Sequence, residues 1–246
     1  MYLKYGYVYF LSNQEMSTRD FVVSFRIDGR RPELWDAATG RIEKSLDWLR
    51  RDGRTEVSLK LAPAESAFIV FRETTTETSG SSAPCDTTLL AMNVDEWNIT
   101  FHTTGREIKT PELFDWASHP DQDVKYYSGT ATYTTSFTLP ETKATDRILL
   151  NLDGLHDVAT VIVNGIDCGI VWTAPYSVDI TEALHAGENE LSIAVTNTWA
   201  NALLGADSGH APFDGIWTNG TFRRETQTLI PAGLITQPSF TILSRK

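Results

Sequence analysis

The chain has 246 residues, of which 41% are hydrophobic and 22% charged, so it can bury a core and is not disordered. Its net charge of −11 is unevenly distributed. Residues 1–73 carry 12 Lys and Arg against 11 Asp and Glu, whereas residues 74–246 carry 9 against 21. This asymmetry indicates two modules. The basic residues are scattered, which excludes a nucleic-acid binder because phosphate neutralisation needs a clustered cationic face.

Cysteine, histidine and hydropathy patterns exclude further classes. Two cysteines, Cys85 and Cys168, are too few for a disulfide framework or a Cys-based zinc site. The five histidines form no close ligand pair, so we expect no cofactor, although a structural Ca²⁺ held by backbone carbonyls is left open. No apolar run approaches the ~20 residues that span a bilayer, so no membrane contact is expected. The first ten residues lack the pattern of a signal peptide.

The first module shows the period-two alternation of half-buried strands. Phe21, Val23, Phe25 and Ile27 share one face, and Asp28-Gly29 follow as a turn. Further strands are expected at 57–61 and at the continuous apolar run 67–71. Helical periodicity is absent, so residues 1–73 predict a small antiparallel β-sandwich. Polar residues rich in Thr, Ser and Gly come next and predict a linker at 74–90.

The second module, residues 91–246, again reads as short strands separated by turns. The alternating segments lie at 97–101, 131–139, 148–152, 158–163, 166–172 and 191–195. Asn164-Gly165 is the strongest hairpin signal, because both central positions of a type I′ turn need φ > 0. Two short helical pieces are expected, one over Pro111–Trp116 with Thr110 as N-cap and one over Asp179–Leu184. The pattern predicts an all-β fold in which a jelly-roll sandwich follows the smaller one.

Catalytic motifs are missing. The signatures of serine hydrolases, dinucleotide-binding folds and phosphate-binding loops do not occur. Glycoside hydrolysis needs two carboxylates facing one bond, but with 32 acidic residues no spacing singles out a pair. Asn189-Glu190 is similar to an acid/base glutamate after an asparagine. It lies between a turn glycine and a strand, so we interpret it as part of the turn.

Aromatic and amide side chains give the clearest candidate site. Sugars offer apolar C–H faces to aromatic rings and hydroxyls to Asn, Asp and His. Trp172 and Tyr176 follow the predicted hairpin, where packing at the end of the core is favoured over sugar contact as an explanation. In the loop 197–217, polar groups accompany rings, and binding and structural roles are evenly balanced. The loop candidates are Asn197, Trp199, Asn201, His210 and Trp217.

The order of residues in the second module resembles a known family. Tyr127-Ser128-Gly129, Leu152-Asp153-Gly154, Val163-Asn164-Gly165, Pro175-Tyr176 and Trp199-Ala200-Asn201 occur in the order found in the galactose-binding-like jelly roll of family 2 glycoside hydrolases. The version at the C-terminal end of family 106 α-L-rhamnosidases looks most similar. Asn197, Trp199, Asn201 and Asp207 match that pattern, without roles secure enough to be catalytic. The first module is similar to the β module that precedes the jelly roll in those enzymes.

The resemblance implies a bacterial, polysaccharide-degrading context in which the catalytic carboxylates belong to an upstream (β/α)₈ barrel. Such a barrel typically needs ~250 residues, more than this chain can spare. We therefore expect a non-catalytic C-terminal portion of an α-L-rhamnosidase-like glycoside hydrolase, periplasmic or extracellular, that contacts carbohydrate and a barrel module. The alternatives are an autonomous pair of carbohydrate-binding modules and, ranked last, a complete small glycosidase. No catalytic residue is assigned.

Overall fold

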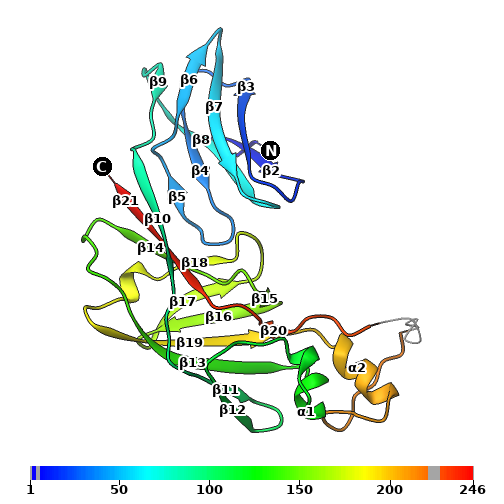
Figure 1. The fold of residues 1–246 in the computed structure, drawn as a ribbon. Coiled ribbons are helices and arrows are strands. Elements are labelled where there is room, and N and C mark those ends of the chain that lie inside the picture. The colour runs from blue at the N-terminus through cyan, green and yellow to red at the C-terminus, as the bar shows by residue number, and fades with distance from the viewer. Residues whose placement is uncertain (1, 4–5, 221–227, 246) are drawn as a thin grey trace. The chain divides into compact units, whose positions relative to one another are not determined.

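The structure is a computed structural model that describes residues 2–3, 6–220 and 228–245. The chain divides into two compact units. Unit 1 comprises Met1–Asp86, Thr173–Pro175 and Arg245–Lys246, and unit 2 comprises Thr87–Trp172 and Tyr176–Ser244. Both units consist of antiparallel strands with little helix, which confirms the predicted all-β class (Figure 1).

Unit 1 contains two antiparallel sheets. The first has the order β1-β2-β8-β4-β5, formed by Tyr2–Leu3, Gly6–Ser12, Ser66–Thr74, Arg30–Trp35 and Ile42–Glu43. The second has the order β3-β7-β6-β9, formed by Arg19–Phe25, Arg54–Leu61, Trp48–Arg51 and Ser79–Gly80. Alternate residues of these strands, including Phe25, Trp48, Val57 and Phe71, form one buried cluster. The apolar run 67–71 lies in β8, between β2 and β4 in the sheet, and all of it is buried except Phe68, which is half-buried.

The segment expected to be a linker is partly strand. β9 pairs with β6, and β10 (Cys85–Ala91) lies beside β21 (Ser239–Arg245). Backbone pairing with partners distant in the sequence orders these polar residues, a contribution that local composition does not reveal. The boundaries 1–73, 74–90 and 91–246 stay predictions.

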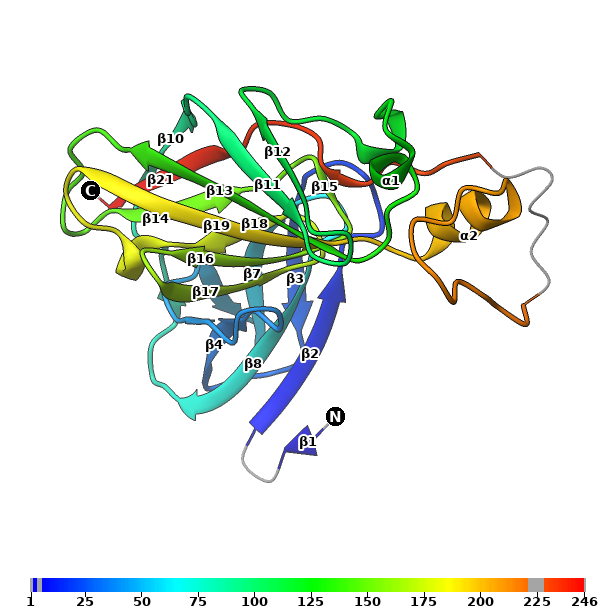
Figure 2. The same ribbon diagram turned by 90° about the horizontal axis from the view of Figure 1, so that it is seen from below.

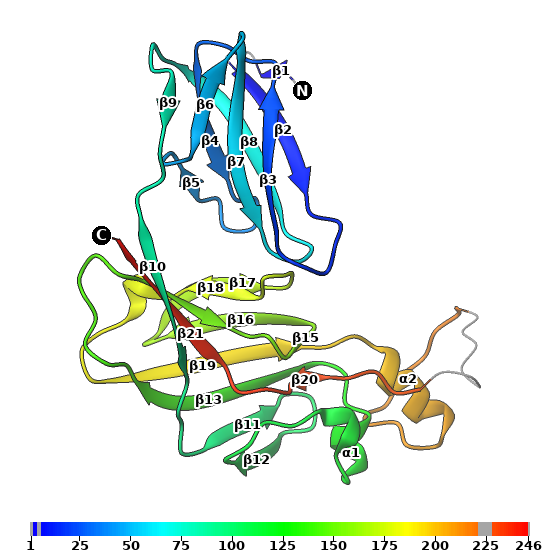
Figure 3. The ribbon, with the colours of Figure 1, turned by 45° about the horizontal axis from the view of Figure 1, so that its top comes forward.

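Unit 2 is a jelly-roll-like sandwich whose main sheets face a shared core. Its six-stranded sheet has the order β12-β11-β13-β19-β16-β17, formed by Arg106–Thr110, Trp97–Phe101, Thr130–Thr138, Glu188–Thr196, Val158–Val163 and Ile166–Val171. The four-stranded sheet has the order β10-β21-β14-β18, with β14 at Arg147–Asn151 and β18 at Ser177–Asp179. Figure 3 shows its strands β10 and β21 side by side. β15 (Leu155–His156) and β20 (Gly233–Leu234) form a small third sheet. Large rings such as Trp97, Phe101, Trp116 and Tyr133 fill the core.

The predicted hairpin forms with the expected turn. Asn164 and Gly165 have φ values of 51° and 78°, as a type I′ turn requires. The Asn164 side chain donates to the Ala183 carbonyl and to Asn189 Oδ1 at 2.8 and 2.7 Å. Asn189 is 1% exposed and its amide also bonds the backbone of His185 and Gly187. Asn189 and Glu190 themselves lie in β19 (Glu188–Thr196) rather than in the turn, and the Asn189 side chain holds the turn that precedes the strand.

The helices differ from the expected ones. Pro111–Trp116 is not a helix; a 3-10 turn, η1, runs from Trp116 to Ser118, and α1 from Gln122 to Lys125. Asp115 caps η1 and also accepts from the Ala232 N–H at 2.9 Å, so a distant segment fixes where the turn starts. The turn expected over Asp179–Leu184 is found as η2, Thr181–Ala183. A further helix, α2 at Ala200–Asp207, lies within the loop 197–217.

Candidate functional site

Residues 197–220, which we call the α2 segment, leave the end of β19 and carry most of the predicted site residues. Figure 2 shows α2 beyond the ends of the strands, beside α1. Figure 1 shows the same neighbourhood from another side. The segment is tied to unit 2 at its start, and two asparagines make the ties.

Asn197 fixes the exit from β19. Its Oδ1 accepts from the Gly129 N–H at 2.9 Å, and its Nδ2 donates to the Tyr127 carbonyl at 2.9 Å. Ser128 Oγ donates to the Thr198 carbonyl at 2.8 Å. The side-chain amide predicted to bind sugar is thus engaged with backbone, and it sets the direction of the chain before α2.

Asn201 closes the base of the segment. It is 1% exposed, its Nδ2 donates to the Ile230 carbonyl at 2.8 Å, and its Oδ1 accepts from the Ile230 N–H at 2.9 Å. Both polar groups of one backbone residue are satisfied by one side chain, as in a strand pair. Asn201 therefore joins the outgoing and returning chains, and its amide faces Ile230 rather than solvent.

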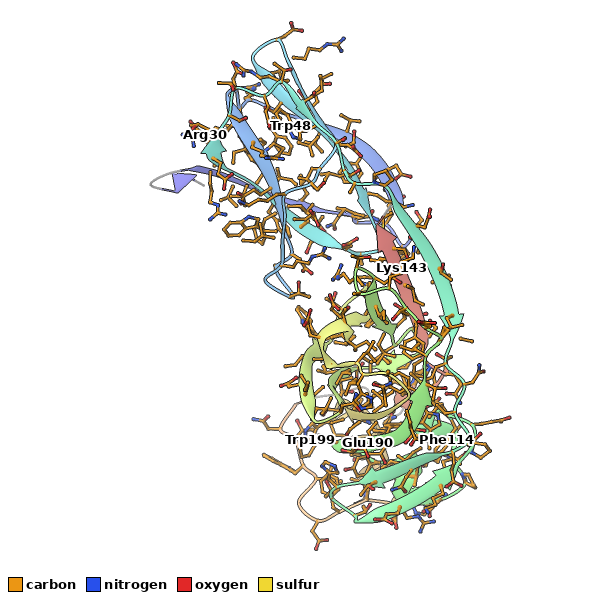
Figure 4. All side chains as sticks on the ribbon, turned by 90° about the vertical axis from the view of Figure 1, so that its left-hand side faces the viewer. Arg30, Trp48, Phe114, Lys143, Glu190 and Trp199 are labelled. Atoms are coloured by element: carbon orange, nitrogen blue, oxygen red, sulfur yellow. The ribbon has the colours of Figure 1, made fainter. Side chains whose placement is uncertain are left out.

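The aromatic side chains of the segment point outward. Trp199 and Trp217 are 55% and 77% exposed. Trp199 packs edge-on against Phe213, with ring centroids 6.1 Å apart and planes at 83°. Among the described residues Trp217 has no ring partner. Trp199, labelled in Figure 4, belongs to the outer surface of this end of unit 2. Large exposed rings near polar groups mark interaction sites more often than single exposed aliphatic residues do.

His210 is brought onto a neighbouring element. Its ring stacks parallel to that of Tyr126, at a centroid distance of 6.0 Å and an interplanar angle of 1°. Gly205 permits this approach, since a Cβ there would lie 2.6 Å from Tyr126 Cγ and 2.8 Å from the His210 carbonyl oxygen. Lys125 Nζ lies 5.7 Å from the Tyr126 centroid. Tyr126 was absent from the sequence-based site, because no local signal joins it to residue 210.

The other candidates lie at the end of α2 and in the chain that follows β17. Asp207 is an exposed residue at the end of α2. Trp172 is 60% exposed and follows β17, two strands from β19 in the sheet. Tyr176 is half-buried against the core, and its carbonyl accepts from the Leu152 N–H at 2.8 Å. Core packing, the alternative considered for these two rings, therefore describes Tyr176 and not Trp172.

Glu65 and Asp36 are two carboxyl groups of unit 1 whose charges interact. Burial raises the pKa of Glu65 and the nearby Asp36 charge adds to the effect, against the hydrogen bond from the Ala62 N–H. Glu65 Oε2 accepts that bond at 2.6 Å, and Asp36 accepts from Ala38 N–H and Thr39 Oγ1 at 2.8 and 2.6 Å. Both carboxyl groups hold turns of unit 1, which accounts for them structurally.

The described residues contain no group of three or more His, Cys, Asp or Glu side chains that could hold a metal ion. Within the same part of the chain, none of the helices has the length and apolar character to cross a membrane.

Comparison with known proteins places these features in a family. A family model described as glycosyl hydrolase 2 galactose-binding domain-like matches residues 115–229. This part of the chain is a galactose-binding-like domain of the glycosyl hydrolase 2 type. The match includes β13, β19, β16 and β17 of the six-stranded sheet, the hairpin and the α2 segment, and it leaves out β11 and β12.

Two larger proteins are similar to the chain. The structure of a rhamnosidase from Novosphingobium sp. PP1Y superposes with a TM-score of 0.89 at 32% identity, over 98% of this chain and 23% of that one. A protein named "Putative beta-glucuronidase" from Formosa agariphila is 34% identical over 119 residues, 46% of this chain and 10% of its own. The chain thus spans less than a quarter of either relative. The galactose-binding-like glycoside hydrolase module expected from the sequence is confirmed.

Proposed function

We propose that the chain is a non-catalytic portion of an α-L-rhamnosidase-like glycoside hydrolase, located in the periplasm or outside the cell, whose α2 segment contacts carbohydrate. The observation that carries the proposal is the pair of exposed rings, Trp199 and Trp217, on a segment anchored by Asn197 and Asn201. An indole ring buries a large apolar area on contact, which suits the C–H face of a sugar.

The anchoring of the α2 segment favours ligand binding, because a chain that is already ordered loses less conformational entropy when the ligand binds. A ring on a loose loop loses conformational freedom when a ligand binds, at roughly 0.5–1.5 kcal/mol per side chain. Here the start of α2 is fixed by hydrogen bonds of Asn197 and Asn201 to Gly129 and Ile230, and Phe213 packs against the Trp199 ring. His210 and Asp207 add exposed polar groups close by in the sequence. We assign the asparagines a positioning role and the rings the contact role.

Two settings are compatible with this proposal. In the first, the α2 segment reaches the cleft of a catalytic barrel module in a longer protein, as the superposition on less than a quarter of a rhamnosidase favours. In the second, the two units act as an autonomous carbohydrate-binding pair. Exposure of Trp199 and Trp217 in the chain by itself makes the second testable without the barrel.

Tryptophan fluorescence during titration with rhamnose-containing oligosaccharides tests the proposal. We expect a saturable change in the wild-type chain and an affinity loss of about tenfold or more for Trp199→Ala and Trp217→Ala, since buried aromatic contacts dominate binding energy. Trp172→Ala is the matched control, because Trp172 is equally exposed but lies outside the α2 segment. Equal behaviour of all three variants would contradict the assignment.

A further inference from the structure

A second candidate site lies on the outer face of the six-stranded sheet, apart from the α2 segment. A groove of about 510 Å³ crosses β13, β19 and β16 and ends at the turn glycine Gly165. Ligand pockets typically measure about 300–1,000 Å³. Its lining includes Thr134, Ser136, Ile162 and Ser192, with Glu190 at one side.

The groove follows from the register of the sheet. Ser192 on β19 lies opposite Thr134 on β13 and opposite Ile162 on β16, so a small side chain separates two larger ones. The next outward residue on β19 is Ala194, which is also small. Outward-facing residues at these positions are exposed or half-buried, so the depression opens to solvent.

The polar side chains of the groove are of two kinds. Thr134, Thr135 and Asn164 bond Asn98, Glu96 and Ala183, whereas three others are available. Towards the other end of the sheet, Thr130 Oγ1 bonds Thr196 Oγ1 at 2.7 Å, and Thr132 Oγ1 bonds His102 Nε2 at 2.8 Å. In the described part of the chain, the side chains of Ser136, Ser192 and Glu190 make no hydrogen bond or ion pair. These groups can therefore bind a ligand without giving up an internal partner.

The chemistry of the lining selects the kind of ligand. Serine and threonine hydroxyls both donate and accept, and a carboxylate accepts two hydroxyl protons, which suits the adjacent hydroxyls of a sugar ring. Ile162, 36% exposed, offers an apolar contact for C–H groups. No Lys, Arg or His occurs among the described residues that line the groove. A uronate or sulfate group would meet the Glu190 charge without a compensating cation.

We propose that this groove binds an uncharged glycan chain and discriminates against acidic glycans through Glu190. The site is independent of the rings of the α2 segment. A protein module that covers the sheet face is the competing occupant, and it would leave the groove unresponsive to soluble glycans.

Amide chemical shifts of the full chain, followed during titration with xylohexaose and separately with hexagalacturonate, test the proposal. We expect shifts at Thr134, Gly165 and Ser192 with xylohexaose only. Ser192→Tyr, which fills the depression on an outward strand position, should weaken xylohexaose binding by about tenfold. Thr100→Tyr is the matched control, because Thr100 on β11 pairs with Thr132 on β13 and lies outside the groove.

Glu190→Lys provides a variant at an exposed position that should fold normally. It is expected to gain hexagalacturonate binding at the same residues. Absence of shifts in the groove with both glycans, or an unchanged affinity in Ser192→Tyr, overturns the proposal. Shifts confined to residues 197–220 also overturn it while leaving the function of the α2 segment intact. Groove shifts that persist in Trp199→Ala support the groove even if the α2 segment fails its own test.

Discussion

Asn201 shows how one side chain can decide the shape of a functional segment. Its amide replaces the two hydrogen bonds that a neighbouring strand would give to Ile230. Because the group is buried, removing it leaves an N–H and a C=O without partners in a place that water reaches poorly. Asn197 acts similarly on Gly129 and Tyr127. Asn197 and Asn201, which have structural roles, are thus close in the sequence to Trp199, which is proposed to contact sugar.

Asn201→Ala should lower the free energy of unfolding by about 1–3 kcal/mol, the cost of unpaired buried polar groups. Urea denaturation followed by tryptophan fluorescence measures the change. Asn219→Ala is the control, since Asn219 is an exposed asparagine of the same segment. If the two variants unfold at the same urea concentration, the hydrogen bonds between Asn201 and Ile230 do not stabilise the fold.

Sequence patterns over a few residues predicted the turns and strands that are determined by interactions within those same residues. The type I′ turn was found because Asn164 and Gly165 are the residues that accept positive φ. The alternating strands of both units follow from side-chain periodicity in the same way. By contrast, the start of η1 depends on the hydrogen bond that Asp115 accepts from the Ala232 N–H. The position of the His210 ring depends on the Tyr126 ring against which it stacks. Such pairings join distant segments, so a pattern read over a few residues does not contain them. Helix α2 was missed although Ala200, Ala202 and Leu203 are good helix formers.

Arg147, Asp179 and Thr181 form a group of hydrogen bonds at the junction of β14, β18 and η2, which we call the clasp. Arg147 Nε donates to Asp179 Oδ2 at 2.5 Å, and Thr181 donates to Asp179 Oδ1 through its hydroxyl at 2.6 Å and its N–H at 3.1 Å. Burial alone would raise the pKa of Asp179, but these bonds outweigh it and the net pKa lies below the ordinary 3.8. Because the folded pKa is depressed, the clasp stabilises the fold above pH 3.8 and loses this contribution as the pH falls through the folded pKa.

We therefore expect the stability difference between the wild-type chain and Asp179→Asn to be largest near neutral pH and to shrink in acid. Hydrogen bonds to a charged group contribute about 1.5–3 kcal/mol, and partial exposure of this pair places the effect near or below the lower value. Urea denaturation at a series of pH values measures it. If the difference in the free energy of unfolding stays constant as the pH falls, the stabilisation does not depend on the charge of Asp179.

At the scale of the whole molecule, the chain is two β units, each with its own buried cluster of side chains. The family match lies in unit 2, and the superposition on a rhamnosidase extends across nearly the entire chain. The acidic surplus found in residues 74–246 therefore belongs mainly to the galactose-binding-like part. An acidic module with exposed rings is suited to neutral sugars, for which aromatic and hydroxyl contacts replace charge pairing.

We propose that the chain as a whole binds carbohydrate without cleaving it. Saturation-transfer difference NMR on a rhamnose-containing oligosaccharide, mixed with the chain and followed over time, tests both parts in one measurement. We predict saturation transfer to sugar C–H protons, weakened in a Trp199→Ala/Trp217→Ala double variant, and an oligosaccharide spectrum that does not change. Absence of transfer in the wild-type chain, or the appearance of free rhamnose, would contradict it.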